Sequence, residues 1–238
     1  MNIAIIGYGK MGREIEKTAI ERGHTIALII DLHNEKDFST QNLKICDVAL
    51  EFTSPLSAPQ NIIKCFNSGI PVVTGTTGWK DNIDEIIKLC LEKNGALFHS
   101  SNYSPGVNIL AMVNQYLAGI MDSFPQYDVE MTEIHHTEKL DKPSGTAISL
   151  AEQILQKIKR KKIWTLENKE NPEELIINSI REGEIKGIHE IVYNSDIDYI
   201  SIRHSAKSRK GFALGAVMAA EYLHNKKGVF TMKDLFEF

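Results

Sequence analysis

The first twelve residues, MNIAIIGYGKMG at positions 1–12, contain the pattern that decides the fold. Ile3 to Ile6 is a short apolar run typical of a buried strand, and glycines follow it at positions 7, 9 and 12. Lys10 to Arg22 then carries apolar residues at helical spacing. A strand, a glycine turn and a helix in this order predict the first βαβ unit of a mainly parallel sheet.

The same alternation of strand-like and helix-like patterns continues to about residue 100. Because strands alternate with helices, we expect the strands to pair in parallel. The link at 31–46 is polar and too short for a complete additional βα unit. Further strands are expected at 25–30, 47–52, 70–74 and 96–99, with helices at 57–67 and 80–93.

Beyond Tyr127 the strand-like stretches become longer, and one strong helix near Thr146 interrupts them. This texture predicts a second α+β domain built on a mostly antiparallel sheet. Its strands are expected at 127–136, 174–183, 187–195 and 197–207. Helical character returns at 212–223, and an amphipathic stretch follows at 229–238. We therefore expect one domain from 1–104 and 210–238, and a second from 105–209.

Composition bounds the class of protein. The chain has 238 residues, and its 27 Lys and Arg against 31 Asp and Glu give a net charge of −4. This charge offers no overall basic field for nucleic acid or an anionic membrane, and no apolar run approaches the ~20 residues of a transmembrane helix. Three cysteines without CxxC spacing predict neither a disulfide framework nor a structural zinc site. With no signal-peptide pattern at the N-terminus, we expect a soluble, cytoplasmic protein with reduced thiols.

The glycine turn predicts a bound dinucleotide. In GxGxxG, Gly7 permits the tight turn, Gly9 lets a pyrophosphate approach the backbone, and Gly12 allows close packing of helix and strand. Asp31 ends the second expected strand, where its carboxylate can accept hydrogen bonds from the adenosine ribose. A 2′-phosphate would be repelled there, so NADH is favoured over NADPH, although His33 could supply a partial positive charge. The first domain is therefore expected to be a Rossmann-type dinucleotide-binding domain.

Two polar loops are further candidates for the cofactor site. GTTG at 75–78 and SNYS at 101–104 each follow an expected parallel strand. Open α/β sheets bind ligands at that carboxyl edge, so the hydroxyl, amide and ring groups could hold the nicotinamide and its ribose. The alternative is that both are plain connections.

The stretch 133–147, EIHHTEKLDKPSGTA, contains two adjacent histidines, a lysine and a Ser-Gly-Thr turn within fifteen residues. A metal site is not expected, because His135 and His136 are adjacent on a strand and face opposite ways, and no third ligand has a convincing spacing. Catalysis fits better, since a histidine can exchange a proton near neutral pH and Lys139 can donate one or bind a carboxylate.

The end of the same stretch predicts a small-anion site. Ser144 is a plausible N-cap, which would leave the backbone N–H groups of Gly145 and Thr146 at a positive helix end, suited to a substrate carboxylate. The alternative is a capped helix after a polar loop with surface histidines. The crowding of polar functions favours the catalytic interpretation.

These motifs resemble those of the 4-hydroxy-tetrahydrodipicolinate reductase (dihydrodipicolinate reductase) family of bacterial lysine and diaminopimelate synthesis. EIHHTEKLDKPSGTA is similar to the family's signature, and the similarity extends over nearly the whole chain. It includes GYGKMG at 7–12, EFTSP at 51–55, TGTTG at 74–78, SNYSPGVN at 101–108, REGEIKGIHEIVY at 181–193 and HSAKSRKGFALGA at 204–216. The glycine turn is one residue shorter than the family's common form, and Ile188 stands where a glutamate is common.

The resemblance implies a reductase that acts on a small cyclic dicarboxylate, with a nucleotide domain, a substrate domain and assembly as a homotetramer. His135 is implied as proton donor or acceptor and Lys139 as proton donor. The implied substrate-binding residues are His136, Lys139, Ser144, Gly145 and Thr146. The expected cofactor-binding residues are Gly7, Tyr8, Gly9, Lys10, Met11, Gly12, Asp31, Phe52, Thr53, Gly75, Thr76, Thr77, Ser101, Asn102, Tyr103, Ser104 and Arg209.

Two other functions stay open at this point. A related NAD(P)-dependent amino-acid dehydrogenase would share the nucleotide domain and would act on a 2-amino acid. A non-catalytic NAD-sensing module would need no proton donor, so the stretch 133–147 argues against it.

Overall fold

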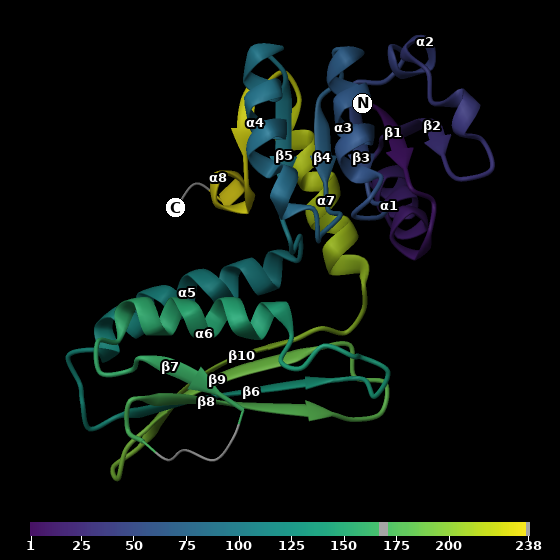
Figure 1. The fold of residues 1–238 in the computed structure, drawn as a ribbon. Coiled ribbons are helices and arrows are strands. Elements are labelled where there is room, and N and C mark those ends of the chain that lie inside the picture. Colours follow the sequence, from purple (N-terminus) through teal and green to yellow (C-terminus); the bar gives the residue numbers. More distant parts are fainter. Residues whose placement is uncertain (167–170, 237–238) are drawn as a thin grey trace. The chain divides into compact units, whose positions relative to one another are not determined.

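The computed structural model describes residues 1–166 and 171–236. The chain divides into two compact units, Met1–Pro105 with Arg209–Phe238, and Gly106–Ser208. Figure 1 follows the chain through both units. Residues 167–170 and 237–238, the last two of the expected amphipathic stretch, lie outside the described residues.

The first unit contains a six-stranded sheet in the order β11-β5-β4-β3-β1-β2, and every neighbouring pair is parallel (Figure 1). The α/β fold expected from the glycine turn is confirmed. The final strand β11 was not expected, because its three residues are too few to show a strand pattern. The strands are β1 (Asn2–Ile6), β2 (Thr25–Ile30), β3 (Val48–Glu51), β4 (Val72–Thr74), β5 (Ala96–His99) and β11 (Gly228–Phe230).

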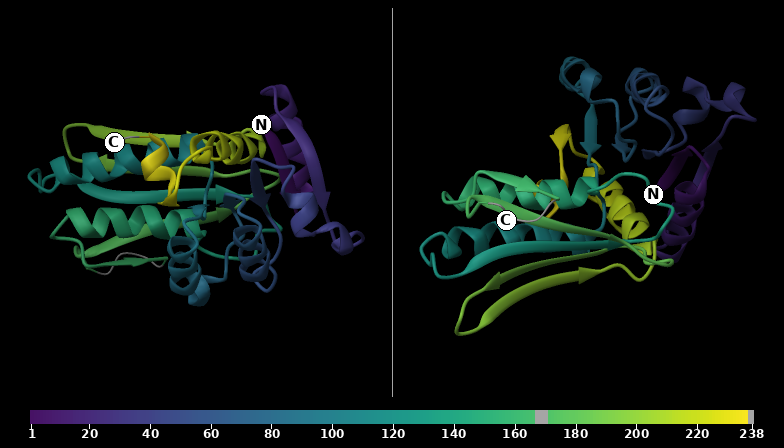
Figure 2. Two further views of the ribbon diagram at one scale, coloured as in Figure 1. Left: turned by 90° about the horizontal axis from the view of Figure 1, so that it is seen from above. Right: turned by 60° about the horizontal axis from the view of Figure 1, so that its bottom comes forward.

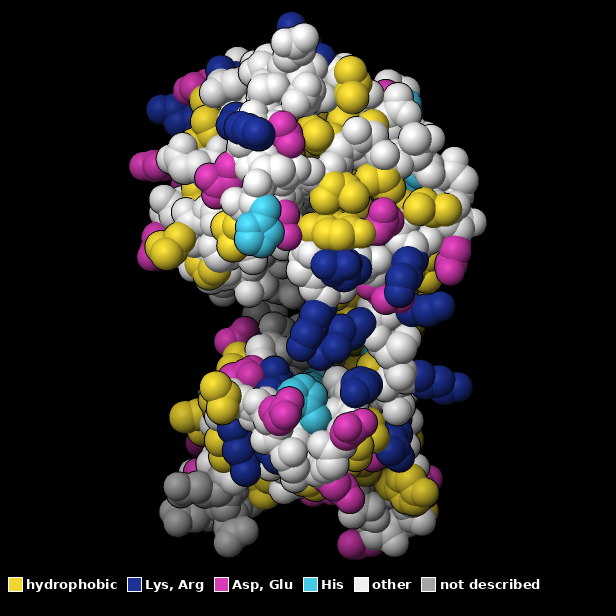
Figure 3. All heavy atoms as spheres, turned by 90° about the vertical axis from the view of Figure 1, so that its right-hand side faces the viewer, with side chains coloured by type: hydrophobic (Ala, Val, Ile, Leu, Met, Phe, Trp, Pro, Cys, Tyr) yellow, Lys and Arg dark blue, Asp and Glu magenta, His cyan; other side chains and the backbone are white. Residues whose placement is uncertain are grey.

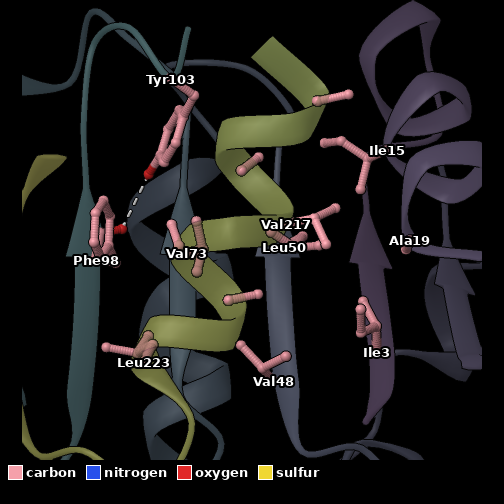
Figure 4. Packing of buried hydrophobic residues seen from close by; sticks show 14 of the residues in the cluster. Ile3, Ile15, Ala19, Val48, Leu50, Val73, Phe98, Tyr103, Val217 and Leu223 are labelled. Atoms are coloured by element: carbon pink, nitrogen blue, oxygen red, sulfur yellow. Dashed lines mark hydrogen bonds between the residues drawn. The ribbon is translucent and has the colours of Figure 1, made fainter. Parts of the chain in front are cut away.

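Helices cover this sheet, and alternating residues of its strands enter two cores. Ile3 and Ile5 of β1 belong to one apolar cluster with residues of α1 and α7, whereas Ala4 and Ile6 belong to another with residues of α3 and α4. Figure 4 shows α7 packed along the strands of the first cluster. The helices are α1 (Lys10–Glu21), η1 (Glu35–Asp37), α2 (Thr40–Leu43), α3 (Ala58–Asn67), η2 (Lys80–Asn82), α4 (Ile83–Glu92), α7 (Lys210–Leu223) and α8 (Met232–Phe236).

The second unit contains a five-stranded sheet in the order β10-β9-β6-β8-β7. The strands are β6 (Asp128–His135), β7 (Ile163–Thr165), β8 (Glu174–Arg181), β9 (Ile188–Asn194) and β10 (Tyr199–Ser205). The sheet is mixed, so the expectation of a mostly antiparallel sheet was wrong. β9 pairs antiparallel with β6 and β10, but β8 pairs parallel with β6 and β7. The reason is α6 (Gly145–Lys157), which follows β6 and acts as a crossover that returns the chain in the same direction.

Two helices, α5 (Pro105–Met121) and α6, lie along one face of this second sheet, as Figures 1 and 2 show. Their apolar residues form one core with alternate residues of β6, β8 and β9, including Met131, Ile177 and Ile191. The residues between them in each strand face the opposite side. In the part of the chain that the structure describes, no helix has the length and apolar character needed to span a membrane.

Candidate active site

The glycine turn in the first unit is tight because two of its glycines have no room for a side chain. Gly7 has φ +94°, and a Cβ there would lie 2.2 Å from the Phe52 carbonyl oxygen. A Cβ on Gly12 would lie 2.2 Å from the Gly7 carbonyl oxygen, whereas one on Gly9 would meet nothing within 4 Å. Gly9 is the N-cap of α1, with no side-chain cap and no acidic residue in the first turn. This helix end can therefore accept a phosphate.

A pocket of about 870 Å³ opens beside this turn. It brings together six of the residues expected at the cofactor site, and its size and its glycine rim fit the adenosine end of a nicotinamide dinucleotide. The six are Gly7, Tyr8, Gly9, Asp31, Phe52 and Thr53. Residues that sequence reasoning did not assign also line it, among them Leu32, Glu35, Phe38, Asn61 and Lys64.

Asp31 lies in this pocket immediately after β2, and its loop is fixed by hydrogen bonds. The Asp31 N–H donates to Asn34 Oδ1 at 2.7 Å, and the Leu32 N–H donates to Asp31 Oδ1 at 2.9 Å. Glu35 adds a second carboxylate to the same pocket, while Lys64 Nζ lies 4.4 Å from the ring centre of Phe38. The lining thus carries two acidic groups where the ribose is expected.

The loops after β3 and β4 are tied together by a buried carboxylate that sequence reasoning missed. Glu51 is completely buried, and its side chain accepts hydrogen bonds from the hydroxyls of Thr53 and Thr74. The Thr53 N–H donates to Thr76 Oγ1 at 2.8 Å, which links the two loops. The expected cofactor residues Thr53 and Thr76 therefore have fixed positions.

The other expected cofactor residues have different environments. A Cβ on Gly75 would lie 2.1 Å from the Phe52 ring, so this glycine permits close packing. Tyr103 is buried in the apolar core, where its hydroxyl donates to the Phe98 carbonyl, as Figure 4 shows. The same hydroxyl lies within hydrogen-bonding distance of the Thr74 carbonyl. Arg209 is exposed at the N-cap of α7. The residues Lys10, Met11, Thr77, Ser101, Asn102 and Ser104 do not line the pocket.

In the second unit, the strand register places a row of polar side chains across the sheet. Glu133 of β6 pairs with Ser179 of β8 on one side and with His189 of β9 on the other. His135 lies two residues along β6 and therefore on the same face as Glu133. Glu133, His135 and His189 are all buried. The rings of His135 and His189 meet edge to face with centroids 5.2 Å apart.

The Glu133 carboxylate is the centre of this row. Its Oε1 accepts hydrogen bonds from the Ser144 N–H at 3.0 Å, from the Ser179 hydroxyl and from Arg181 Nη2 at 3.2 Å. Its Oε2 lies 3.2 Å from His135 Nδ1 and 3.8 Å from His189 Nε2. Burial alone would raise the pKa of Glu133, but the contacts with His135, Ser144 and Ser179 outweigh burial and hold that pKa well below its ordinary value. Glu133 is therefore an anion.

His189 is neutral at physiological pH. Burial, with the neighbouring His135 as the next cause, lowers the pKa of His189 to about 4. Its Nε2 lies 3.2 Å from Ser144 Oγ, which also accepts a hydrogen bond from the Ala147 N–H. Ser144 is thus the N-cap of α6 and joins the start of this helix to the row on the sheet.

The remaining expected residues lie around this row. His136 is half-buried and directly follows the end of β6 at His135. Lys139 Nζ forms an ion pair with Asp141 Oδ1 at 2.8 Å, in a loop after β6. Gly145 and Thr146 are the first residues of α6. Figure 3 shows histidine at the surface of the second unit among Lys, Arg, Asp and Glu side chains.

Three side chains of the row, Glu133, His135 and His189, lie close enough to share a metal ion, since their ligand atoms are within 4.8 Å of one another. Sequence spacing could not show this third ligand, because His189 reaches β6 only through the strand register. Arg181 already lies against the single carboxylate, so a dication would face a second positive charge. The residues fit a metal poorly on this ground.

Sequence reasoning assigned no role to Glu133, Ser179, Arg181 or His189. One signal was present, because the alternate positions 133 and 135 share a face of any strand. The other three come from β8 and β9, and their approach depends on pairings that the chain order does not reveal.

Comparisons with known proteins agree over the length of the chain. Residues 1–103 match the family described as dihydrodipicolinate reductase, N-terminus, and residues 106–236 match dihydrodipicolinate reductase, C-terminus. A 4-hydroxy-tetrahydrodipicolinate reductase of Christiangramia forsetii is 46% identical over 239 residues, covering 99% of this chain and 97% of the relative. A 4-hydroxy-tetrahydrodipicolinate reductase of Staphylococcus aureus is 34% identical over 253 residues, covering 99% of this chain and 100% of the relative.

Solved structures show the same fold. A dipicolinate-bound dihydrodipicolinate reductase from Paenisporosarcina aligns with a TM-score of 0.76 at 22% identity, covering 97% of each chain. An aspartate dehydrogenase from Thermotoga maritima aligns with a TM-score of 0.52 at 12% identity, covering 95% of this chain and 97% of that one. At these identities the likeness concerns the fold alone.

Proposed function

The chain belongs to the dihydrodipicolinate reductase family, and from this premise we propose that it reduces 4-hydroxy-tetrahydrodipicolinate to tetrahydrodipicolinate in the diaminopimelate pathway of lysine biosynthesis. The observation that carries the proposal is the 46% identity to a reductase of that name over 99% of the chain. The resemblance of the sequence motifs to this family is confirmed. A nicotinamide cofactor supplies the hydride when it is bound.

In the first unit, the glycine turn and the pocket hold the dinucleotide. The uncapped N-terminus of α1 receives the pyrophosphate, and Asp31 receives the adenosine ribose. Thr53 and Thr76, fixed to each other, shape the loops along the carboxyl edge of the sheet. These residues bind and orient the cofactor without exchanging a proton.

In the second unit, His135 delivers the proton that the reduced ring requires. The net change adds one hydride and one proton to the substrate and releases one water. A positioned general acid therefore suits the reaction, and a histidine can act as one near neutral pH. His135 is mostly buried, so solvent has little access to it.

Cationic and N–H groups bind the two carboxylates of the substrate. Lys139, His136 and the start of α6 at Gly145 and Thr146 supply these groups. Lys139 now pairs with Asp141, whose side chain is 57% exposed. An exposed ion pair contributes little stability, so a substrate carboxylate can replace Asp141 at the ammonium group.

The acidic lining of the pocket favours NADH over NADPH. Asp31 and Glu35 both repel a 2′-phosphate, and no arginine lines the pocket among the described residues. Lys64 is the cation of this lining, and it lies over the Phe38 ring.

Assembly and location complete the proposal. In the part of the second unit that the structure describes, the sheet face turned away from α5 and α6 exposes Tyr199 of β10 by 69% and Ile180 of β8 by 42%. An apolar face of this kind suits the self-association of a homotetramer, which light scattering on the purified chain would test. Cys46, Cys65 and Cys90 are all free and buried, as suits the cytoplasm.

A coupled assay tests the function. A synthase makes the substrate from pyruvate and aspartate semialdehyde, and nicotinamide absorbance then reports its reduction. We expect oxidation of NADH that depends on both the chain and the substrate. If NADH is oxidised only when a 2-amino acid's keto partner and ammonia are supplied, the reductase proposal is wrong and the dehydrogenase alternative returns.

A further inference from the structure

Glu133 has no role in the proposed function so far, yet its two oxygens have sharply different surroundings. Oε1 accepts three donors, from the Ser144 backbone, the Ser179 hydroxyl and the Arg181 guanidinium. Oε2 faces His135 Nδ1 at 3.2 Å. Among the described residues, neither Oε2 nor Nδ1 completes a hydrogen bond of regular geometry, either with each other or with any other group. His135 Nδ1 is the nearer of the two ring nitrogens that face Oε2, since His189 Nε2 lies 3.8 Å from it.

This contact decides which nitrogen of His135 carries the fixed proton. A carboxylate accepts hydrogen bonds and donates none, so Nδ1 must carry hydrogen where it faces Oε2. Nε2 is then the atom that gains and loses the exchangeable proton. It lies beside Gly187, where an added Cβ would come within 3.1 Å of Nε2. The absence of a side chain at Gly187 leaves room at this nitrogen.

The other charged and titratable groups support this arrangement. Arg181 on β8 lies on the Oε1 side of the carboxylate, and His189 on β9 is neutral, so neither places a charge between Oε2 and Nδ1. Lys139, in the loop after β6, pairs with Asp141. His204 on β10 acts electrostatically on His189, and burial lowers the pKa of His204.

We infer that Glu133 is the positioning residue of the proton donor: its ionised carboxylate holds the Nδ1–H of His135 and stabilises the imidazolium, so that Nε2 exchanges the proton with the substrate. The inference rests on the proposed function for the identity of the donor. Glu133, His135 and His189 are poor ligands for a shared metal ion, because Arg181 already neutralises the charge of Glu133.

The substitution Glu133→Gln tests the inference because the structure dictates how the new amide would lie. Three donors meet Oε1, so the amide oxygen must occupy that position and the NH₂ group must face His135. The NH₂ group would donate to Nδ1, which moves the proton of neutral His135 to Nε2 and removes the charge that stabilises the imidazolium.

We expect three results from Glu133→Gln. The kcat falls about tenfold or more, while the KM for NADH stays unchanged. The limb of the kcat profile that reports loss of the donor's proton moves to lower pH by roughly one to two units, because an adjacent opposite charge is lost. Nitrogen-15 NMR of the imidazole shows protonated Nδ1 in the neutral wild-type residue and protonated Nε2 in the variant.

Glu51→Gln is the matched control. It is the same substitution at a completely buried glutamate of the first unit, whose partners are hydroxyl, amide and backbone N–H groups. It should leave the pH limb and the His135 resonances where they are. Glu133→Asp keeps the charge and should retain the pH limb, even if the shorter side chain lowers kcat.

Two outcomes would overturn the inference. One is a neutral wild-type His135 that carries its proton on Nε2, which requires no variant to fold. The other is a Glu133→Gln enzyme whose kcat falls while its pH limb and imidazole resonances stay unchanged, which indicates a purely structural glutamate. Failure of the proposed function is distinct, since the wild-type chain would then not oxidise NADH with the cyclic dicarboxylate in the coupled assay, while the wild-type His135 resonances would still report the contact with Glu133.

Discussion

Glu51 and Glu133 are both completely buried, one in each unit, but their carboxylates have different partners. Glu51 meets neutral donors, chiefly the hydroxyls of Thr53 and Thr74. Glu133 meets Arg181, His135 and His189 in addition to neutral donors. A carboxylate among hydroxyls fixes the shape of loops, whereas a carboxylate beside an imidazole also controls where a proton resides.

The two sites that contain these glutamates differ in the same way. The proposed cofactor site depends on backbone shape and on the absence of side chains at Gly7 and Gly12. The second site depends on titratable side chains held in register across three strands. Substitutions should therefore change cofactor affinity in the first unit and turnover in the second, and the following experiments can break or sharpen this contrast.

The largest effect is expected from His135→Ala. Removing a positioned general acid should lower kcat by ~10²–10⁴-fold and leave the Kd for NADH unchanged, because the residue is not in the cofactor pocket. Lys139→Ala should also lower kcat strongly. Steady-state kinetics and NADH titration measure both effects, with exposed His224→Ala as the control. Near-wild-type turnover in both variants would place the chemistry elsewhere.

The next effect concerns folding stability and pH. In the unfolded chain His189 gains its proton near pH 6.5, whereas in the folded chain it gains the proton only near pH 4. In that window the unfolded state binds more protons, so stability falls as pH falls, by up to roughly 3 kcal/mol. Urea unfolding across this range measures the loss, to which His99 and His204 contribute in the same direction. A His189→Gln variant with an equally steep loss would refute this origin.

Alanine substitutions at Gly9 and Gly12 should differ in their effect on folding stability while both weaken NADH binding. Gly12→Ala places a Cβ 2.2 Å from the Gly7 carbonyl, so we expect a loss of about 1–3 kcal/mol in stability together with weaker NADH binding. Gly9→Ala meets nothing in the protein, so it should weaken NADH binding by about tenfold without lowering stability. Thermal unfolding and NADH titration distinguish the two. Equal NADH affinity in wild type and Gly9→Ala would remove the turn from the site.

The smallest effect is expected at Asp31. Asp31→Ser removes one carboxylate from the pocket, which should raise the ratio of kcat/KM for NADPH over NADH by about tenfold or less, because Glu35 remains. Initial rates with both cofactors give the ratio. A wild-type enzyme that already prefers NADPH would show that Lys64 or His33 outweighs the two acids.

Local patterns predicted five of the six strands in the first unit. The limits of β2 and β5 follow from runs of apolar residues, and the glycine turn follows from GxGxxG, since each of these signals lies within a few neighbouring residues. β11 was not predicted, because three residues between a turn and a short helix show no strand periodicity.

The second unit was harder to predict because its sheet depends on contacts between distant segments. The crossover at α6 makes β6 and β8 parallel, and nothing in the strand sequences specifies that direction. The same holds for the candidate site, where the sequence predicts His135 as the proton donor, but the surroundings of Glu133 come from Ser179, Arg181 and Ser144. A short sequence motif can identify a candidate residue, but it cannot show which residues from distant segments contact it.

A double-mutant cycle tests the separation of the two sites most directly. Gly9→Ala, His135→Ala and the double variant are compared by kcat/KM for NADH at saturating substrate. If one unit holds the cofactor and the other delivers the proton, the two fold-losses should multiply, with a coupling energy within about 0.5 kcal/mol of zero. A double variant no worse than His135→Ala alone would contradict this separation.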